Sequence, residues 1–461
     1  MNLHSKQKII LLLSVLAVIA SAFYSPAGME APLFRGLILT VVFMVNLVSG
    51  ALPVMLLCLV TLGIQSLLGI TESFSASFGG FSNQAVYFVM MSFGLAAVLM
   101  ETPICKRILK WFFNKLGKNI EGLILANMLC AAITSAFISD VPTTVIYMTF
   151  GSLILTVYEH EEDRKRTGRC VMIGTSIACM IGGISTPVGS TVNIIALSVL
   201  AEQGMTVGFI QWMSVCAPVA LILVVLSWKL LVTMYKPSQV APAETEKFIR
   251  SFASESAMSA KEKCTIVIFV CMFVLWVASS WIKEINTMQV MFLGVCIMAL
   301  PGIGVTTIDK IIKNVKFDIL LLVATMITLC GTLMDNGFGA LVQGFVPNEP
   351  VATPVVILAV IVAMYLLILV IPIAPSLTTV ATPILIAIGG ALGIHPQLLV
   401  MVCSMSIGCG YLLPTDSVFL LTYGKGYYSI GEYSKVSAVI MAAAAVLILV
   451  VAYPIMLALD I

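Results

Sequence analysis

Apolar stretches follow one another along this 461-residue chain and are separated by short polar loops. Most are about 20 residues long, which is the length a helix needs to cross a hydrocarbon core of about 30 Å. The first stretch, residues 9–24, follows a basic start, and no small-residue cleavage pattern comes after it. We interpret it as a membrane helix rather than a signal peptide. The pattern therefore predicts an all-α membrane protein.

Basic residues in short loops mark the cytoplasmic side of a membrane protein. Here they gather in four clusters, within residues 106–118, 164–169, 229–263 and 310–316. When all four are placed inside, alternation of the spans gives about eleven transmembrane helices and two re-entrant helical hairpins. The amino terminus is then cytoplasmic and the carboxyl terminus extracytoplasmic.

The apolar stretch 120–158 begins and ends on the same face, because it lies between the first two basic clusters. Two spanning helices or one re-entrant hairpin would both satisfy this. Its centre is polar, contains Asp140 and is interrupted by Pro142. A charged side chain at membrane depth is tolerated only where it is buried in protein or lines a cavity. The centre therefore favours the hairpin.

A second stretch of this kind spans residues 353–392 and is interrupted at 372–379. Its flanks, 346–350 and 393–396, carry no Lys or Arg, so we expect a hairpin that enters from the opposite side. Two hairpins of opposite orientation predict two inverted repeats.

Each hairpin is followed by an apolar span that is itself interrupted. The register that superimposes Gly208 on Gly431 also superimposes Asn193 on Asp416. The predicted domains are an amino-terminal helix (1–30), a first inverted repeat (31–235, with hairpin 120–158 and broken helix 170–200), a cytoplasmic linker (236–263) and a second inverted repeat (264–461, with hairpin 353–392 and broken helix 397–425).

Paired interruptions in two inverted halves are the best sequence pointer to a transporter's site near the bilayer midplane. Broken helices leave N–H groups that favour an anion at their amino ends, and freed carbonyls suit a small cation such as sodium. No Lys or Arg lies in any interruption. We therefore expect helix dipoles, hydroxyls and a co-bound cation to hold the anion. Asp140 and Asp416 would each repel a carboxylate unless protonated or paired with a cation.

Composition excludes other classes of function. The chain is 60% hydrophobic and 10% charged, whereas soluble proteins have about 25% charged residues. A net charge of +2, without a basic stripe, argues against nucleic-acid binding. The twelve cysteines form no CxxC pair, and no Ser/His/Asp group, HExxH motif or Gly-rich phosphate loop is present, so we expect no enzyme.

The interruptions carry recognisable motifs. The hairpin tips read Ser139-Asp140-Val141 and Ser376-Leu377-Thr378, and the broken spans read Thr186-Pro187-Val188-Gly189-Ser190-Thr191-Val192-Asn193 and Pro414-Thr415-Asp416. Over most of its length the chain resembles the divalent anion:sodium symporter (DASS) family, the di- and tricarboxylate transporters. In that family the tips carry Ser-Asn-Thr and the unwound spans Thr-Pro or Pro-Pro-Asn. Both tip asparagines are replaced here.

The resemblance implies a homodimer in the plasma or inner membrane, with a fixed scaffold domain and an elevator-like transport domain in each subunit. It implies secondary transport of succinate, malate, fumarate, citrate or 2-oxoglutarate with sodium. By position, the substrate, a small organic anion, would contact Ser139, Asp140, Val141, Thr186, Pro187, Ser376, Leu377, Thr378, Pro414 and Thr415. Sodium would be held by Ser139, Asp140, Gly189, Asn193, Ser376, Thr378 and Asp416.

The acids that replace amides leave alternatives open. An Asp can bind sodium or carry a proton. A dicarboxylate exchanger, a proton-coupled carrier, and a cation/proton antiporter or inorganic-anion permease of the same superfamily are therefore alternatives.

Overall fold

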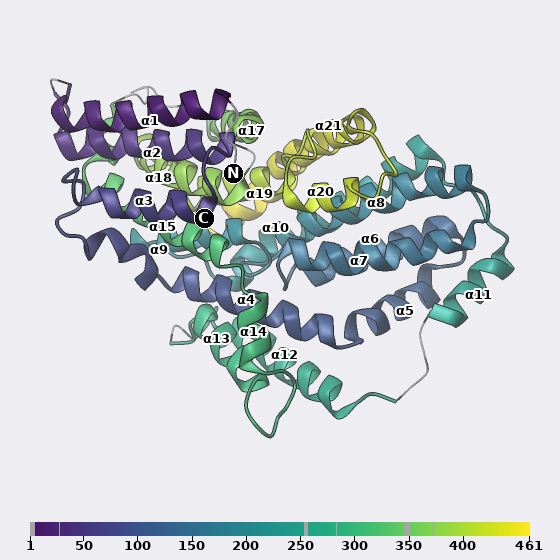
Figure 1. Ribbon diagram of the computed structural model, residues 1–461. Helices are drawn as coiled ribbons and strands as arrows, with labels where there is room; N and C mark the ends of the chain where they lie inside the picture. The colour runs from purple at the N-terminus through teal and green to yellow at the C-terminus, as the bar shows by residue number, and fades with distance from the viewer. Residues whose placement is uncertain (1–4, 27, 253–256, 283, 345–350, 372) are drawn as a thin grey trace. The chain divides into compact units, whose positions relative to one another are not determined.

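The computed structural model describes residues 5–26, 28–252, 257–282, 284–344, 351–371 and 373–461 (Figure 1). In these residues the regular structure consists of 22 α-helices, two short 3-10 helices and one π-helical turn, with no β-strand. The expectation of an all-α protein is confirmed. Pro372 of the second hairpin, its flank 346–350 and residues 253–256 of the linker lie outside the described residues.

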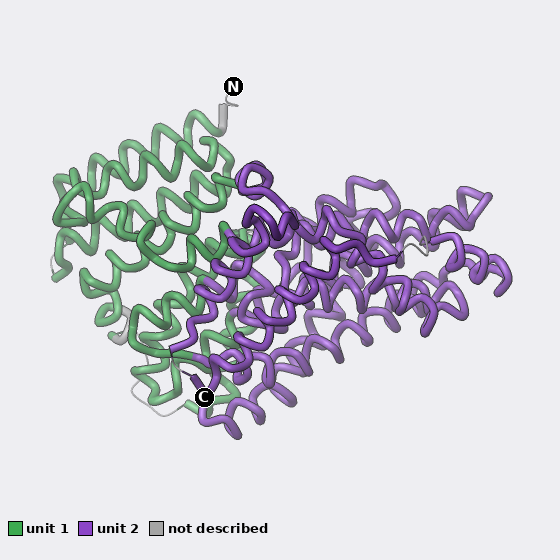
Figure 2. The backbone as a smooth tube through the Cα atoms, turned by 90° about the horizontal axis from the view of Figure 1, so that it is seen from below, with its two compact units in different colours: residues 1–90, 195–206, 316–403 green, residues 91–194, 207–315, 404–461 purple. Residues whose placement is uncertain are grey.

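The helices divide into two compact units, which Figure 2 distinguishes by colour. Unit 1 comprises residues 1–90, 195–206 and 316–403, and unit 2 comprises residues 91–194, 207–315 and 404–461. Three helices pass from one unit to the other: α4 (Gln84–Glu101), α9 (Thr191–Glu202) and α19 (Pro396–Cys409). The inverted repeats remain a prediction, because compactness in space does not report internal symmetry.

Unit 1 contains both arms of the second expected hairpin. Its helices are α1 (Ser5–Phe23), α2 (Ala31–Ser49), α3 (Val54–Gln65), η1 (Ala76–Ser82), α15 (Phe317–Asp335), α16 (Phe338–Gln343), α17 (Thr353–Val370) and α18 (Ala374–Leu392). Apolar side chains of α2, α3 and α15 form its core, with Phe43, Cys58 and Met326 buried. The Gly80 N–H of η1 donates to the Thr328 hydroxyl of α15 at 3.0 Å, which holds the short η1 turn against this core.

Unit 2 contains the first expected hairpin. Its helices are α5 (Ile104–Leu116), α6 (Ile120–Ser135), α7 (Asp140–Ile154), η2 (Leu155–Val157), α8 (Glu161–Gly183), α10 (Phe209–Tyr235), α11 (Pro242–Phe252), α12 (Ala260–Ala278), α13 (Thr287–Met298), α14 (Ile308–Asn314), α20 (Ser417–Tyr423), α21 (Ile430–Leu447), the π-helical turn Ile448–Ala452 and α22 (Tyr453–Ala458). Both α6 and α7 pack on α8. Any Cβ on Gly182 of α8 would collide with the Ala132 backbone of α6. Small residues permit such close approach between membrane helices.

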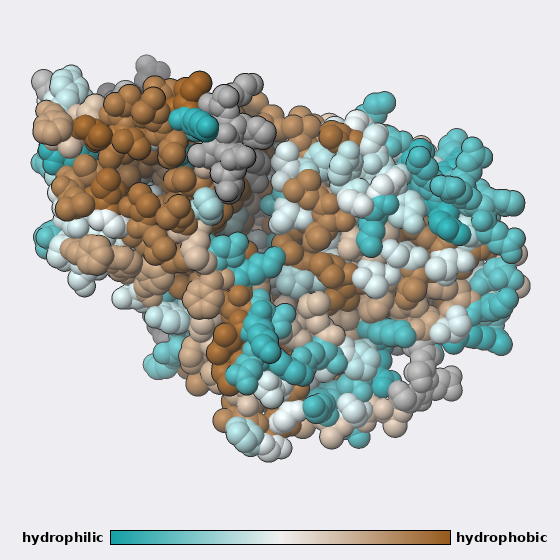
Figure 3. All heavy atoms as spheres, viewed as in Figure 1, coloured by the Kyte–Doolittle hydropathy of each residue, from teal (hydrophilic) through white to brown (hydrophobic). Residues whose placement is uncertain are grey.

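Eight helices of the described part are long and apolar enough to cross a membrane, so the chain is a multi-pass membrane protein. Apolar side chains cover the surface over α1–α3 in Figure 3, whereas hydrophilic residues gather around α11. The number of spans, the re-entrance of the hairpins and the side on which each terminus lies remain predictions.

Each expected interruption contains a break between two helices, but the one expected at 372–379 is shorter than predicted, because α18 begins at Ala374. The broken pairs are α6 and α7, α8 and α9, α17 and α18, and α19 and α20. Each break ends one run of backbone hydrogen bonds, which leaves N–H and C=O groups available for other partners.

The expected linker contains a helix of its own. Phe252 of α11 packs against Phe113 of α5, with ring centroids 5.0 Å apart, and against Phe150 of α7 at 5.7 Å. The Lys106 ammonium lies 5.4 Å from the centroid of the Phe252 ring, within cation–π range. The linker is therefore fastened to the first hairpin.

Candidate ion and substrate site

The tip of the first hairpin places a carboxylate at the start of a helix. Ser139 precedes α7, and Asp140 is its first residue. Pro142 is tolerated in this first turn, because its missing N–H would have no partner inside the helix. Asp140 is 9% exposed, and its Oδ1 accepts a hydrogen bond from the Ser135 hydroxyl at 2.7 Å. The sequence did not single out Ser135, whose role depends on the turn between α6 and α7.

The first broken helix is tied to this tip. The Thr186 hydroxyl donates to the Ala136 carbonyl oxygen. Asn193 Nδ2 donates to the carbonyl oxygens of Gly183 at 2.9 Å and of Thr186 at 2.8 Å. The break between α8 and α9 and the turn between α6 and α7 thus form one hydrogen-bonded structure.

Gly189 lies at the centre of a cluster of carbonyl oxygens. A Cβ at this position would lie 2.5 Å from the carbonyl oxygen of Gly183, 2.9 Å from that of Ala136 and 3.0 Å from that of Ser135. Real Cβ atoms essentially never come so close to backbone. The position requires glycine, and the close approach brings oxygens of two elements together.

These oxygens suit a small hard cation. The carboxyl ends of α6 and α8 both terminate here, and helix dipoles favour positive charge at such ends. Asn193 Oδ1 is buried without a hydrogen-bond partner, and the Asp140 carboxylate lies against Gly183. No group of three His, Cys, Asp or Glu side chains able to hold a metal occurs in the described residues. Sodium, which transporters coordinate with unwound carbonyls, fits better than a transition metal.

The second broken helix adds another carboxylate to unit 2. Asp416 caps α20, and its Oδ1 accepts from the Val418 N–H at 2.9 Å. The short α20 packs against α7 and α8, so Asp416 at the start of α20 and Asp140 at the start of α7 lie on packed helices. Of the neighbouring residues predicted to bind substrate, Pro414 is buried and Thr415 exposed.

Tyr411 is a residue that the sequence did not single out. Its side chain is 7% exposed, and its hydroxyl has no hydrogen-bond partner among the described residues. Its ring packs on Phe419, with centroids 4.7 Å apart. Tyr411 lies in the break between α19 and α20, the same break that contains Asp416. It is therefore a neutral donor held in the same interruption as a carboxylate. One hint lay in the sequence, since Tyr411 falls inside the expected broken helix 397–425.

The second hairpin tip belongs to unit 1. Ser376 is fully buried, and its hydroxyl has no partner there. The Thr378 hydroxyl donates to the Ala374 carbonyl of its own helix at 2.9 Å, and Leu377 is buried. Ser376 is thus the residue of this tip with a hydroxyl left for a ligand.

Several predicted site residues lie close together in unit 2. Asp140, Thr186, Gly189 and Asn193 share contacts around Gly183 and Ala136. Pro187 is buried beside Thr186, while Ser139 and Val141 are half-buried on either side of Asp140. The roles of these residues, and the pairing of Ser376 and Thr378 with Asp416, remain predictions.

The sequence profile of the sodium:sulfate symporter transmembrane region matches residues 4–459. The chain belongs to this family. The resemblance to the divalent anion:sodium symporters is thereby confirmed, and this sodium:sulfate symporter family member is a membrane transporter rather than an enzyme. In such a family sodium is a co-substrate and not a cofactor.

Known proteins similar to this family member include two sodium-dependent dicarboxylate transporters named SdcS. The protein of Staphylococcus saprophyticus is 22% identical over 433 residues, which cover 88% of this chain and 83% of that protein. The protein of Staphylococcus aureus strain USA300 is 21% identical over 417 residues, 85% of this chain and 80% of that protein.

Among solved structures, the Alcanivorax borkumensis YdaH transporter, whose topology is described as unusual, is similar in fold. The TM-score is 0.54 at 14% identity, with 81% of this chain and 86% of that chain covered.

Proposed function

We propose that this family member is a secondary transporter that couples sodium to the movement of a di- or tricarboxylate of the succinate, malate, fumarate, citrate or 2-oxoglutarate class. The observation that carries the proposal is the oxygen cluster around Gly189, with the buried Asp140 and the unpaired Asn193 Oδ1 beside it. Similarity to the two SdcS proteins supports the choice of substrate.

The cluster accounts for coupling between cation and anion. Without a cation, the Asp140 carboxylate would repel a carboxylate substrate. Sodium held by Asp140, Gly189 and Asn193 offsets that charge, so the substrate binds after the cation. The first turn of α7 then offers N–H groups and a favourable dipole to the anion.

Neutral groups complete the anion site. In this proposal the substrate contacts the residues that the family resemblance indicates: Ser139, Thr186, Pro187, Ser376, Leu377, Thr378, Pro414 and Thr415. The Tyr411 hydroxyl is a further donor. The protein works as a homodimer by elevator-type alternating access.

Proton coupling is the second candidate, and the observation that favours it is the pair of acids Asp140 and Asp416, at the starts of the packed helices α7 and α20. In a proton-coupled carrier, or in a cation/proton antiporter, these side chains exchange protons with the two sides. An exchanger or an inorganic-anion permease would use the same site without net sodium movement.

Uptake into liposomes distinguishes these candidates. Purified protein should accumulate labelled succinate, citrate or 2-oxoglutarate when sodium is placed outside, and not when potassium replaces it. Uptake driven only by a proton gradient would favour proton coupling, and uptake only with dicarboxylate inside would favour exchange. No uptake of any of these acids under all three conditions contradicts the carboxylate proposal.

A further inference from the structure

Unit 2 also contains an apolar groove, whose lining differs chemically from the oxygen cluster. A groove of about 370 Å³ lies between α5, the tip end of α6 and the first turns of α12. Its walls are almost entirely apolar and include Ile104, Ile108, Ile133, Phe137, Phe269 and Val270. Ile133 is 45% exposed and Val270 52% exposed, so the groove opens onto the outer surface, where a membrane protein meets acyl chains.

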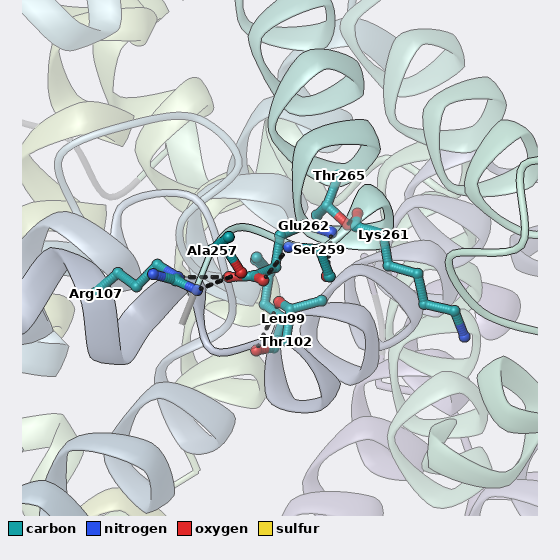
Figure 4. A network of polar contacts seen from close by, with 8 residues as sticks. All are labelled: Leu99, Thr102, Arg107, Ala257, Ser259, Lys261, Glu262 and Thr265. Atoms are coloured by element: carbon teal, nitrogen blue, oxygen red, sulfur yellow. Dashed lines mark hydrogen bonds and ion pairs between the residues drawn. The ribbon is translucent and has the colours of Figure 1, made fainter. Parts of the chain in front are cut away.

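The groove meets a polar network at one end, through Arg107, and Figure 4 shows that network. Arg107, which lines the groove, donates through Nε to Glu262 Oε1 at 2.6 Å, and Glu262 Oε2 accepts from the Ser259 N–H at 2.8 Å. The Arg107 guanidinium holds the pKa of the Glu262 carboxyl below its ordinary value. Glu262 is therefore charged and fully engaged by its partners.

Positive charge surrounds this end. Lys261 and Lys263 are exposed at the start of α12. They lie one turn before Thr265 and Ile266, which line the groove, and they flank the groove's face of the helix on its two sides. On α5, the exposed Trp111 follows Ile108 by one turn, and exposed Trp residues are typical of the membrane–water interface.

The length of the groove fits one leaflet of a bilayer. From Glu262 to Val270 along α12 is about 12 Å at about 1.5 Å per residue. This length is close to the thickness of one leaflet, which is half of a hydrocarbon core of about 30 Å. An apolar channel of that length, with lysines at its polar end, matches a phospholipid with an anionic headgroup.

We propose that this groove binds an acyl chain of an anionic phospholipid, with the headgroup phosphate at the start of α12, in the positive field of the exposed Lys261 and Lys263. The far wall is the hairpin tip itself, because the Phe137 ring packs against Phe269 and Phe273 at 5.7 and 5.6 Å. A lipid there contacts the turn that ends at Asp140, and so stabilises the tip.

Native mass spectrometry of the delipidated full-length protein tests this proposal, with dioleoyl phosphatidylglycerol and dioleoyl phosphatidylcholine as probes. We expect the phosphatidylglycerol to bind at least about fivefold more tightly, since one surface lysine contributes about that factor. The double variant Lys261→Gln/Lys263→Gln should abolish the preference. The matched control Lys115→Gln/Lys118→Gln, also exposed lysines of unit 2, should retain it.

Two single variants fill the groove from opposite walls, Ile133→Trp and Val270→Trp. Each should remove one tightly bound lipid, whereas Val439→Trp, on the exposed face of α21, should not. A cooperative thermal transition checks that each variant is folded. Equal binding of the two lipids by the unaltered protein would overturn the proposal, and so would folded groove-filling variants that keep the full number of lipids.

Discussion

The polar groups of the two hairpin tips differ in type and in hydrogen-bond partners. In unit 2 the tip of α6 and α7 holds a buried carboxylate that is hydrogen-bonded to Ser135 and faces a cluster of carbonyl oxygens. In unit 1 the start of α18 contains no charged residue: Thr378 and Thr379 donate to carbonyls of their own helix, and Ser376 alone has a buried unpaired hydroxyl.

This difference separates two tasks. A cluster of acceptor oxygens at the carboxyl ends of two helices, with Asn193 Oδ1 buried and unpaired beside it, favours a cation. A hydroxyl at the amino end of a helix can donate to an anion, and it costs free energy when left unpaired in the apo protein. The first tip is therefore better suited to sodium and the second to the substrate.

The largest expected effect comes from Gly189→Ala. The added methyl would collide with three carbonyl oxygens and displace them. We expect sodium affinity to fall about 100-fold, which corresponds to about 2.7 kcal/mol of binding free energy, within the usual range of overpacking penalties. Sodium-dependent uptake and the sodium-induced thermal shift should both disappear. Gly431→Ala, where the new Cβ meets open space, is the matched control. Normal sodium dependence of uptake by Gly189→Ala would show that the oxygen cluster does not take part in sodium coupling.

Asp140→Asn tests the charge at the first tip. The amide oxygen can still accept from Ser135, so the fold should be retained, but the sodium concentration for half-maximal uptake should rise about tenfold, for about 1.4 kcal/mol of lost attraction. Asp416→Asn should have a smaller effect, because Asp416 is partly exposed. If Asp140→Asn leaves sodium dependence intact and abolishes the dependence on a proton gradient, the carboxyl carries a proton instead.

Ser376→Ala tests the second tip. Removing an unpaired buried hydroxyl should leave the thermal midpoint unchanged or raise it slightly, while the KM for succinate rises about fivefold for one hydrogen bond of about 1 kcal/mol. Sodium affinity measured without substrate should not change. Thr382→Val, which loses only a hydrogen bond to its own helix, provides the comparison. An altered sodium shift in Ser376→Ala would contradict the division of tasks.

The smallest expected effect belongs to Tyr411→Phe. Its hydroxyl has no partner to lose, so stability should be unchanged, and the KM should rise about threefold for the loss of one neutral donor. Tyr428→Phe is the control, because that hydroxyl pairs with Thr422 at 2.8 Å: it should lower the thermal midpoint and leave the KM alone. The opposite pattern in the two variants would place Tyr411 outside the substrate site.

Local chemistry explains what could be predicted from the sequence. Apolar stretches of membrane length, interrupted by Pro, Gly and a costly Asp140, reveal helices and the places where they break, because a bilayer enforces internal hydrogen bonding. The motifs at those breaks also identified the family. The same motifs, through the family resemblance, indicated Asp140, Gly189 and Asn193 as site residues.

What only the tertiary structure decided is how the freed groups are paired. Side-chain type does not reveal that Ser135 donates to Asp140, or that Asn193 donates to the carbonyl oxygens of Gly183 and Thr186. Nor does it reveal that the hydroxyls of Tyr411 and Ser376 have no partner. Those facts depend on how the turns and helices pack, and the partners of Asn193 are backbone carbonyls, which every residue has. The sequence by itself determined where the helices break and which acids lie there. The tertiary structure decided which oxygens meet at Gly189, because their convergence depends on the packing of α6 against α8 and on no local pattern.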